Sequence, residues 1–502
     1  MEKGPLQRLQ EIAAEIADLH SAAALLAWDE QVYMPKAGAP ARAQQAATLR
    51  RLAHEKLTDP QVGELLEQLA AEHRGDPATD AVAAMLRVMN RKYHQATRVP
   101  AALVAAEAKA ASAAYHAWLQ AREEKNFGPF REPLAEVVKI QVEKAEALGY
   151  EDARYDALLD LYEPEMRTAE VAAVFARLKD FLVPMLGRLS EVLDRVDDGI
   201  LYQEFDEDRQ WALTLEACRA IGFDFDRGRQ DRSVHPFTTA CDMDDVRITT
   251  RINRGFLGSG LFASLHEAGH GLYEQGIDPA FRRSPLGSPI SLGIHESQSR
   301  LYENLVGRSR AFWQFFMPKA AAAFPARLEG VTAEDMYRAV NKVAPSLIRV
   351  EADEVTYPLH IMVRFELEQA LIQGDLTVDD LPGAFDDAME AYLGLRPANS
   401  VEGVLQDIHW SGGYFGYFPT YTLGTLMSVQ IFEAARRDLP HLAADMASGR
   451  FIPLREWLRE HIHRHGSRFM PQELLQRATG SRLDPQPFIN YVEEKYSELY
   501  GL

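Results

Sequence analysis

Residues 266–270 read HEAGH and bring two imidazoles and a carboxylate together on a short stretch of chain. His266 and His270 are four positions apart, which on an α-helix is about 40° around the axis, so both rings can reach one ion. Glu267 lies beside the first histidine, where its carboxylate can meet a water molecule bound to that ion. This is the H-E-x-x-H arrangement of zinc hydrolases, and it predicts metal-assisted hydrolysis.

A helix over residues 260–275, ending near Gly276, must position these groups. Leu261, Leu265 and Leu272 form its apolar face. With 15 histidines in the chain, the motif can also arise by chance as two surface histidines without a metal. The apolar setting argues against that alternative, because uncompensated buried histidines are costly.

Catalytic zinc takes three protein ligands and keeps one position open for water. The segment 289–307 begins with a proline, carries an apolar stripe and is predicted to be the neighbouring helix. Two acids on it, Glu296 and Glu303, are seven residues apart and are rival third ligands. His295 is interpreted as a local hydrogen-bonding residue.

These groups predict amide hydrolysis. Zinc lowers the pKa of its water towards ~7 and polarises a carbonyl oxygen. Glu267 would accept the proton of that water and pass it to the leaving amine. Nothing in these residues identifies which amide is cut.

Arg349 has two interpretations. It can form an ordinary i,i+4 ion pair with Asp353, or it can grip a substrate carboxylate with two parallel hydrogen bonds. The ordinary ion pair is favoured by the sequence alone.

The segment 403–424 interleaves glycines with tyrosines just after His409. It is either a glycine-rich turn with packed aromatics or an adjustable loop that presents donors to an oxyanion. The sequence does not separate the two interpretations.

A second histidine cluster consists of His461, His463 and His465. Arg459 and Arg464 flank it, and two cations disfavour a metal site. We therefore expect a solvated basic helix face.

Elsewhere apolar residues recur at three- and four-residue steps, which predicts amphipathic helices. Leu9, Ile12, Ile16 and Leu19 are an example. Residues 245–252 instead alternate β-branched and polar side chains, which predicts a short strand or hairpin around 235–252. The fold class is therefore mainly α with a small β-hairpin next to the histidine-bearing helix.

The chain has 502 residues, a net charge of −20 and a pI near 5.3. That charge argues against nucleic-acid binding and polybasic membrane attachment. Length alone allows roughly two to four domains. Two cysteines, no apolar signal segment at the N-terminus and no stretch of ~18 apolar residues predict a soluble cytoplasmic protein.

The sequence closely resembles the carboxypeptidase Taq family of zinc metallocarboxypeptidases, and the resemblance extends to LLAWDEQVYMPKAGAPARAQQ at 25–45. The matching stretches are HPF at 235–237, DVRIT at 245–249, HEAGH at 266–270, HESQ at 295–298, IRVEAD at 348–353 and GVLQDIHW at 403–410. The resemblance implies a large helical peptidase fold with a deep central groove, similar to angiotensin-converting enzyme and neurolysin. It also implies a homodimer that uses zinc, with cobalt as a substitute.

The resemblance further implies roles for individual residues. It favours Glu296 over Glu303 as the third ligand, because HESQ is the third-ligand motif of the family. His409 and Tyr417 then look like oxyanion donors, with Tyr414 as a further candidate. The resemblance also makes Arg349 the leading clamp for a substrate carboxylate. Arg247 is a weaker candidate for the same task, and His235 is placed at the closed end of the groove.

We therefore expect one metallocarboxypeptidase domain over 1–502, with a helical part at 1–230, an active-site core at 231–425 and C-terminal helices at 426–502. It would release single residues from peptides with a free C-terminus. The alternatives are a zinc oligoendopeptidase that uses the same site and, less favoured, a non-enzymatic helical scaffold.

Overall fold

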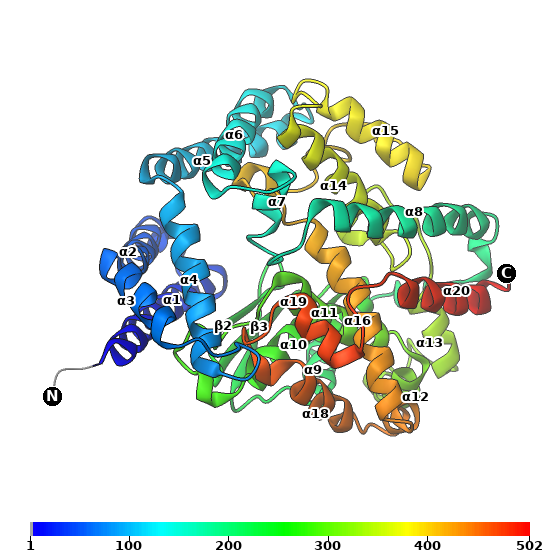
Figure 1. Ribbon diagram of the computed structural model, residues 1–502. Helices are drawn as coiled ribbons and strands as arrows, with labels where there is room; N and C mark the ends of the chain where they lie inside the picture. Colours follow the sequence, from blue (N-terminus) through cyan, green and yellow to red (C-terminus); the bar gives the residue numbers. More distant parts are fainter. Residues whose placement is uncertain (1–3) are drawn as a thin grey trace. The chain divides into compact units, whose positions relative to one another are not determined.

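The computed structural model describes residues 4–502, which fold mainly into helices (Figure 1). The chain divides into two compact units, each built from three separate segments. Unit 1 contains the residues up to Thr97, Asp197–Val340 and Met427–Leu483. Unit 2 contains Arg98–Val196, Asn341–Leu426 and Asp484–Leu502.

Unit 1 holds most of the helices and all the strands of the described chain. Its helices are α1 (Pro5–Val32), α2 (Ala39–Leu57), α3 (Pro60–Glu72), α4 (Ala81–Arg98), α9 (Glu207–Ile221), α10 (Gly258–Gly276), α11 (Leu292–Arg300), α12 (Arg310–Ala323), α13 (Ala333–Val340), α17 (Leu442–Ala447), α18 (Ile452–His461) and α19 (Pro471–Thr479). Helix α16 (Pro419–Asp438) begins in unit 2 and ends in unit 1.

The sheet of unit 1 has three strands in the order β1-β3-β2. The predicted hairpin is confirmed as β2 (Thr238–Asp242) and β3 (Asp245–Thr250), which pair antiparallel. Strand β1 (Gly228–Arg232) pairs with β3 in parallel and was not predicted. Its sequence, GRQDR, has no β-branched residue, so only its pairing with β3 makes it a strand.

Helix α10 is the predicted HEAGH helix and packs against α9, α11 and β3. Its predicted apolar face is buried, with Leu265 fully inaccessible to solvent. At Gly269 the backbone of α11 approaches so closely that an added Cβ would lie 2.5 Å from the carbonyl oxygen of Gln298 and 2.7 Å from the Cα of Ser299. Glycine is therefore the residue that lets the two helices touch here.

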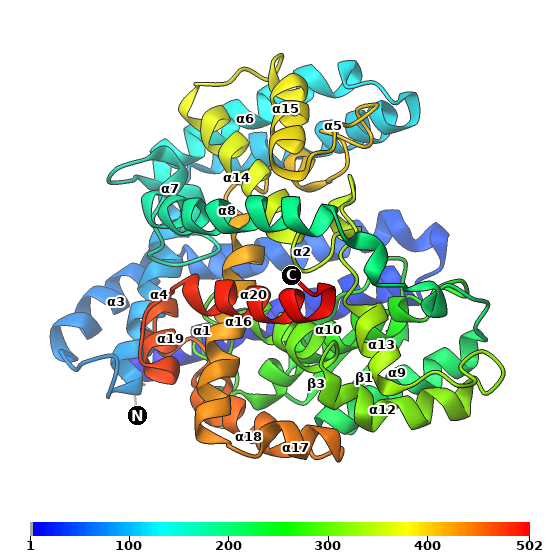
Figure 2. The ribbon, with the colours of Figure 1, turned by 90° about the vertical axis from the view of Figure 1, so that its right-hand side faces the viewer.

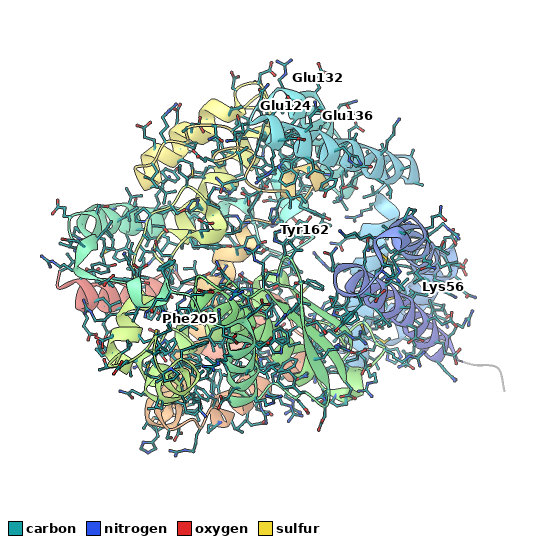
Figure 3. All side chains as sticks on the ribbon, turned by 180° about the vertical axis from the view of Figure 1, so that it is seen from behind. Lys56, Glu124, Glu132, Glu136, Tyr162 and Phe205 are labelled. Carbon is teal, nitrogen blue, oxygen red and sulfur yellow. The ribbon has the colours of Figure 1, made fainter. Side chains whose placement is uncertain are left out.

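Unit 2 contains α5 (Ala101–Glu124), α6 (Gly128–Leu148), α7 (Arg154–Leu159), α8 (Thr168–Ser190), α14 (Tyr357–Gln373), α15 (Leu381–Leu393) and α20 (Gln486–Tyr500). Helices α5 and α6 pack side by side, and α15 packs along α14 (Figure 2). Acidic side chains such as Glu124, Glu132 and Glu136 extend outward from α5 and α6 (Figure 3). These exposed acids account for part of the net negative charge.

We predict that Gly269→Ala destabilises the protein by about 1–3 kcal/mol, because the new methyl group meets helix backbone that cannot turn aside. Urea unfolding followed by circular dichroism measures the change. Gly187→Ala is the matched control, since Gly187 lies inside α8 with no neighbour within 4 Å of an added Cβ. There alanine should stabilise by up to about 1 kcal/mol. Equal effects of the two substitutions would contradict the close approach at Gly269.

Candidate active site

Three potential metal ligands meet where α10 and α11 touch. The ligand atoms of His266, His270 and Glu296 all lie within 4.8 Å of one another. The Nε2 atoms of His266 and His270 are 3.5 and 3.3 Å from Oε2 of Glu296. In a tetrahedral zinc site with ligand distances of about 2.1 Å, neighbouring ligand atoms are about 3.4 Å apart. The donor set and its spacing therefore fit a zinc ion.

Glu303, the rival third ligand, lies outside this group. Its Oε2 is 2.8 Å from Nδ1 of His266, on the side of the ring away from Glu296. Arg300 links the two acids, because Nε donates to Glu296 at 2.7 Å and Nη1 donates to Glu303 at 3.2 Å. Glu303 belongs to a π-helical turn, Leu301–Val306, that continues α11. Its carboxylate accepts the Nδ1 proton and leaves Nε2 of His266 as the ligand atom.

Glu267 is buried next to the ligands and is 6% exposed. Burial raises the pKa of its carboxyl group. The hydroxyl of Thr238 donates to Oε2 of Glu267 at 2.7 Å. Sequence reasoning missed Thr238, although it directly follows HPF and opens β2.

The charges around the ligands favour a cation. Burial lowers the pKa of His266, but the nearby carboxylates of Glu296 and Glu303 outweigh burial and raise it to about 9. Burial and His295 lower the pKa of His270 to about 3, so this imidazole is neutral and keeps a lone pair for a metal. The pKa of Glu296 is well below its usual value, because Arg300 and His266 outweigh burial.

His295 lies beside the ligand group but is not part of it. Its ring stacks on that of His270 with centroids 4.3 Å apart. Its Nε2 is 3.1 Å from Oε1 of Glu274. The interpretation of His295 as a hydrogen-bonding residue agrees with this geometry.

The prediction of a solvated face for the second histidine cluster is wrong at His463, while His461 and His465 are partly exposed. His463 is 1% exposed rather than solvated, and its Nε2 is 2.8 Å from Oε1 of Gln298. Its ring stacks on Tyr273 of α10. His461 stacks on Trp457. His463 packs against the HEAGH helix instead of facing water, and the residues that bury it, such as Tyr273 and Gln298, come from distant parts of the chain.

In unit 2, Arg349 forms an ion pair with Asp407 rather than with Asp353, so the ordinary i,i+4 interpretation is wrong. Nε and Nη2 of Arg349 lie 2.8 and 2.7 Å from Oδ1 of Asp407, and Nη1 donates to Tyr357. Asp353 instead accepts backbone amides at the start of α14. Arg364 holds the other oxygen of Asp407 at 2.8 Å. Two buried guanidinium groups around one carboxylate leave a net charge of +1.

The glycine-rich segment gathers the other predicted residues of unit 2. Nε2 of His409 is 3.2 Å from the hydroxyl of Tyr421. The ring of Tyr417 lies 5.4 Å from that of His409, while Tyr414 is half exposed. Burial, together with Arg349, lowers the pKa of His409 to about 4, so the imidazole is neutral and carries one N–H.

Glu368 on α14 was missed by sequence reasoning. It is fully buried, and burial raises the pKa of its carboxyl group to about 7. His360, Arg364 and Glu368 are spaced by four residues along a helix that is otherwise mostly apolar. That spacing is the signal that identifies a buried polar face.

The weaker candidates lie in unit 1. Arg247 donates to both oxygens of Asp245, at 2.8 and 2.9 Å, and its guanidinium lies 4.2 Å from the ring centroid of Trp28. His235 is exposed. Among the described residues of unit 1, no hydrogen bond or ion pair joins Arg247 or His235 to His266, His270 or Glu296.

The chain has clear relatives. A family model described as carboxypeptidase Taq (M32) metallopeptidase matches residues 8–496. Thermostable carboxypeptidase 1 of Thermus thermophilus is 45% identical over 506 residues, covering 99% of each chain. Carboxypeptidase 1 of Bacillus subtilis is 35% identical and covers 98% of each chain.

Solved carboxypeptidase structures are also similar to this chain. The M32 carboxypeptidase from Deinococcus radiodurans R1 is 41% identical, with a TM-score of 0.95 over 99% of this chain and 100% of that chain. A Pyrococcus furiosus carboxypeptidase is 36% identical, with a TM-score of 0.95 over 99% of both chains. Over residues 4–502, no helix is long and apolar enough to cross a membrane.

We predict that Glu303→Ala weakens zinc binding by about 10- to 100-fold, because His266 loses the acceptor that orients its ring. Competition with a chromogenic chelator measures the affinity. Glu303→Gln is the matched variant, since its amide oxygen still accepts the Nδ1 proton. Its zinc affinity should fall less than that of Glu303→Ala. Zinc affinity unaffected by Glu303→Ala would contradict this role.

Proposed function

Because the chain belongs to the carboxypeptidase Taq (M32) family of metallopeptidases, we propose that it releases single amino acids from the free C-terminal ends of peptides, with zinc as its metal. Family membership makes the protein a metallocarboxypeptidase. The observation that carries the proposed chemistry is the convergence of His266, His270 and Glu296 beside the buried carboxylate of Glu267.

His266, His270 and Glu296 would hold the zinc ion, and cobalt would substitute for it. When bound, zinc supplies Lewis acidity that polarises the scissile carbonyl and acidifies water. Glu303 keeps the proton of His266 on Nδ1, and Arg300 fixes Glu296, so both ligands are oriented before the ion arrives.

Glu267 would act as general base and then as general acid. Thr238 holds Oε2 of Glu267, which leaves Oε1 to accept the proton of the attacking water. The same carboxyl group then gives its proton to the leaving amine. Burial raises the pKa of Glu267, which makes its carboxylate a better proton acceptor for this step.

Arg349 would bind the terminal carboxylate of the substrate. Its three hydrogen bonds to Asp407 and Tyr357 use three of five N–H groups, so two remain for a ligand. The net charge of +1 around Asp407 favours an anion at this position. Arg247 is a weaker candidate, because its pair with Asp245 is neutral, whereas the two arginines around Asp407 keep one positive charge.

His409 and Tyr417 would stabilise the oxyanion that develops on the carbonyl oxygen when water attacks the carbonyl carbon. A neutral imidazole with one N–H and a phenol are both donors, and such donors contribute most when they are oriented in advance. Tyr414 and His235 are assigned to substrate contact at the periphery, in keeping with their exposure. We further propose that the enzyme is one functional domain over 1–502 and works as a cytoplasmic homodimer.

We predict that digestion of a peptide with a free C-terminus gives a ladder of products, each one residue shorter than the last. The same peptide with a C-terminal amide should be resistant, because the carboxylate that Arg349 binds is gone. Mass spectrometry with and without a chelator measures both. Internal fragments would support the alternative oligoendopeptidase.

In the matched variant Glu267→Gln, zinc content should be retained while turnover falls by about two to four orders of magnitude.

We predict that Arg349→Ala lowers kcat/KM for free C-termini by about a hundredfold, mainly through KM, because a charged hydrogen-bonding partner of the substrate is lost. The ratio of kcat/KM for free and amidated peptides measures the effect. Arg349→Lys keeps the charge but loses the fork of donors, and it should recover only part of the activity. An unchanged preference for free termini in Arg349→Ala would assign the clamp to another residue, with Arg247 next.

A further inference from the structure

We infer that Glu368 is a positioning residue for catalysis: its buried carboxylate anchors the loop at residues 409–418, which carries His409 and Tyr417. The inference rests on the proposed function, in which those two residues contact the substrate. Glu368 lies on α14, outside the HPF, DVRIT, HEAGH, HESQ, IRVEAD and GVLQDIHW motifs.

Three hydrogen-bond donors converge on this one carboxylate. The indole Nε1 of Trp410 donates to Oε1 at 2.8 Å. The hydroxyl of Tyr155 and the backbone N–H of Gly416 donate to Oε2 at 2.6 and 3.0 Å. Trp410 lies near the start of the loop and Gly416 near its end, so Glu368 holds the loop at two points.

The loop packs closely against α7 at Gly416. Gly416 has φ +88°, and an added Cβ would lie 2.6 Å from the carbonyl carbon of Leu158 and 2.7 Å from the backbone nitrogen of Leu159. Tyr155, which also donates to Glu368, lies on this helix. Glu368 therefore accepts hydrogen bonds both from the loop and from α7, the helix against which the loop packs.

Tyr417 directly follows this anchor, so the position of its phenol depends on Gly416. Its ring packs edge-on to Tyr162, with centroids 5.2 Å apart, and Tyr162 follows α7 in the chain. The ring of His409 lies 5.4 Å from that of Tyr417. A loop that shifts at Gly416 therefore moves both proposed oxyanion donors.

The anchor requires two acceptor oxygens, which a carboxylate has and an amide lacks. A glutamine at position 368 keeps the size of the side chain but has one oxygen. In one orientation its NH2 group faces the N–H of Trp410, and in the other it faces the N–H of Gly416. Either way a buried N–H of the loop loses its acceptor.

The test compares full-length Glu368→Gln with the wild type on a peptide with a free C-terminus. We expect kcat to fall by about 10- to 100-fold with KM changed less than about threefold, because misplaced oxyanion donors weaken transition-state binding only. Zinc content should be unchanged. Tyr155→Phe removes one of the three donors and leaves both loop bonds, so its kcat should lie between those of the wild type and Glu368→Gln.

Hydrogen–deuterium exchange of the peptide that covers residues 409–418 is the second readout and needs no activity. We expect faster exchange at the Gly416 amide in Glu368→Gln, but not in Leu371→Ala. Leu371 is buried on the same helix, and its truncation lowers stability without removing a hydrogen bond of the loop.

An unchanged kcat in Glu368→Gln, or an equal fall in Leu371→Ala, would overturn the inference. So would unaltered exchange at residues 409–418. If the wild type releases no C-terminal residues, the proposed function fails, while the exchange measurement still decides whether Glu368 anchors the loop.

Discussion

The close contact of α10 and α11 at Gly269 is the constraint on which the metal site depends. Glu296 reaches His266 and His270 only because the two helix backbones meet without a side chain between them. That contact also buries acids and imidazoles that would be costly alone, so each needs a charged or hydrogen-bonded partner. Arg300 and the π-helical turn that carries Glu303 supply those partners.

Each unit contains a cluster of buried charged groups that is not neutral, and the two clusters have opposite signs. Around the candidate ligands, Glu296 and Glu303 pair with the guanidinium groups of Arg300 and Arg308. Glu267 adds a third acid, and the three carboxylates raise the pKa of His266. Around Asp407 the excess is one positive charge. The first setting favours a cation, and the second favours an anion.

The sequence predicted features that rest on local spacing. The HEAGH helix, the β2–β3 hairpin and the two rival acids follow from periods of 3.6 and 2 residues. It did not predict β1, the burial of His463, or the partner of Arg349, which lies 58 positions away. These features depend on contacts between distant segments. A charged residue in a sequence gives no indication of which distant group will neutralise it.

The same four-residue spacing has different consequences on α10 and α14. On α10 it aims His266 and His270 at one carboxylate, which brings two imidazoles within reach of a single metal ion. On α14, Arg364 and Glu368 stand one turn apart with opposite charges, yet neither needs the other. Arg364 pairs with Asp407, and Glu368 accepts three donors of its own. Helix geometry sets which side chains share a face. The groups that arrive from other segments decide whether that face binds a metal or anchors a loop.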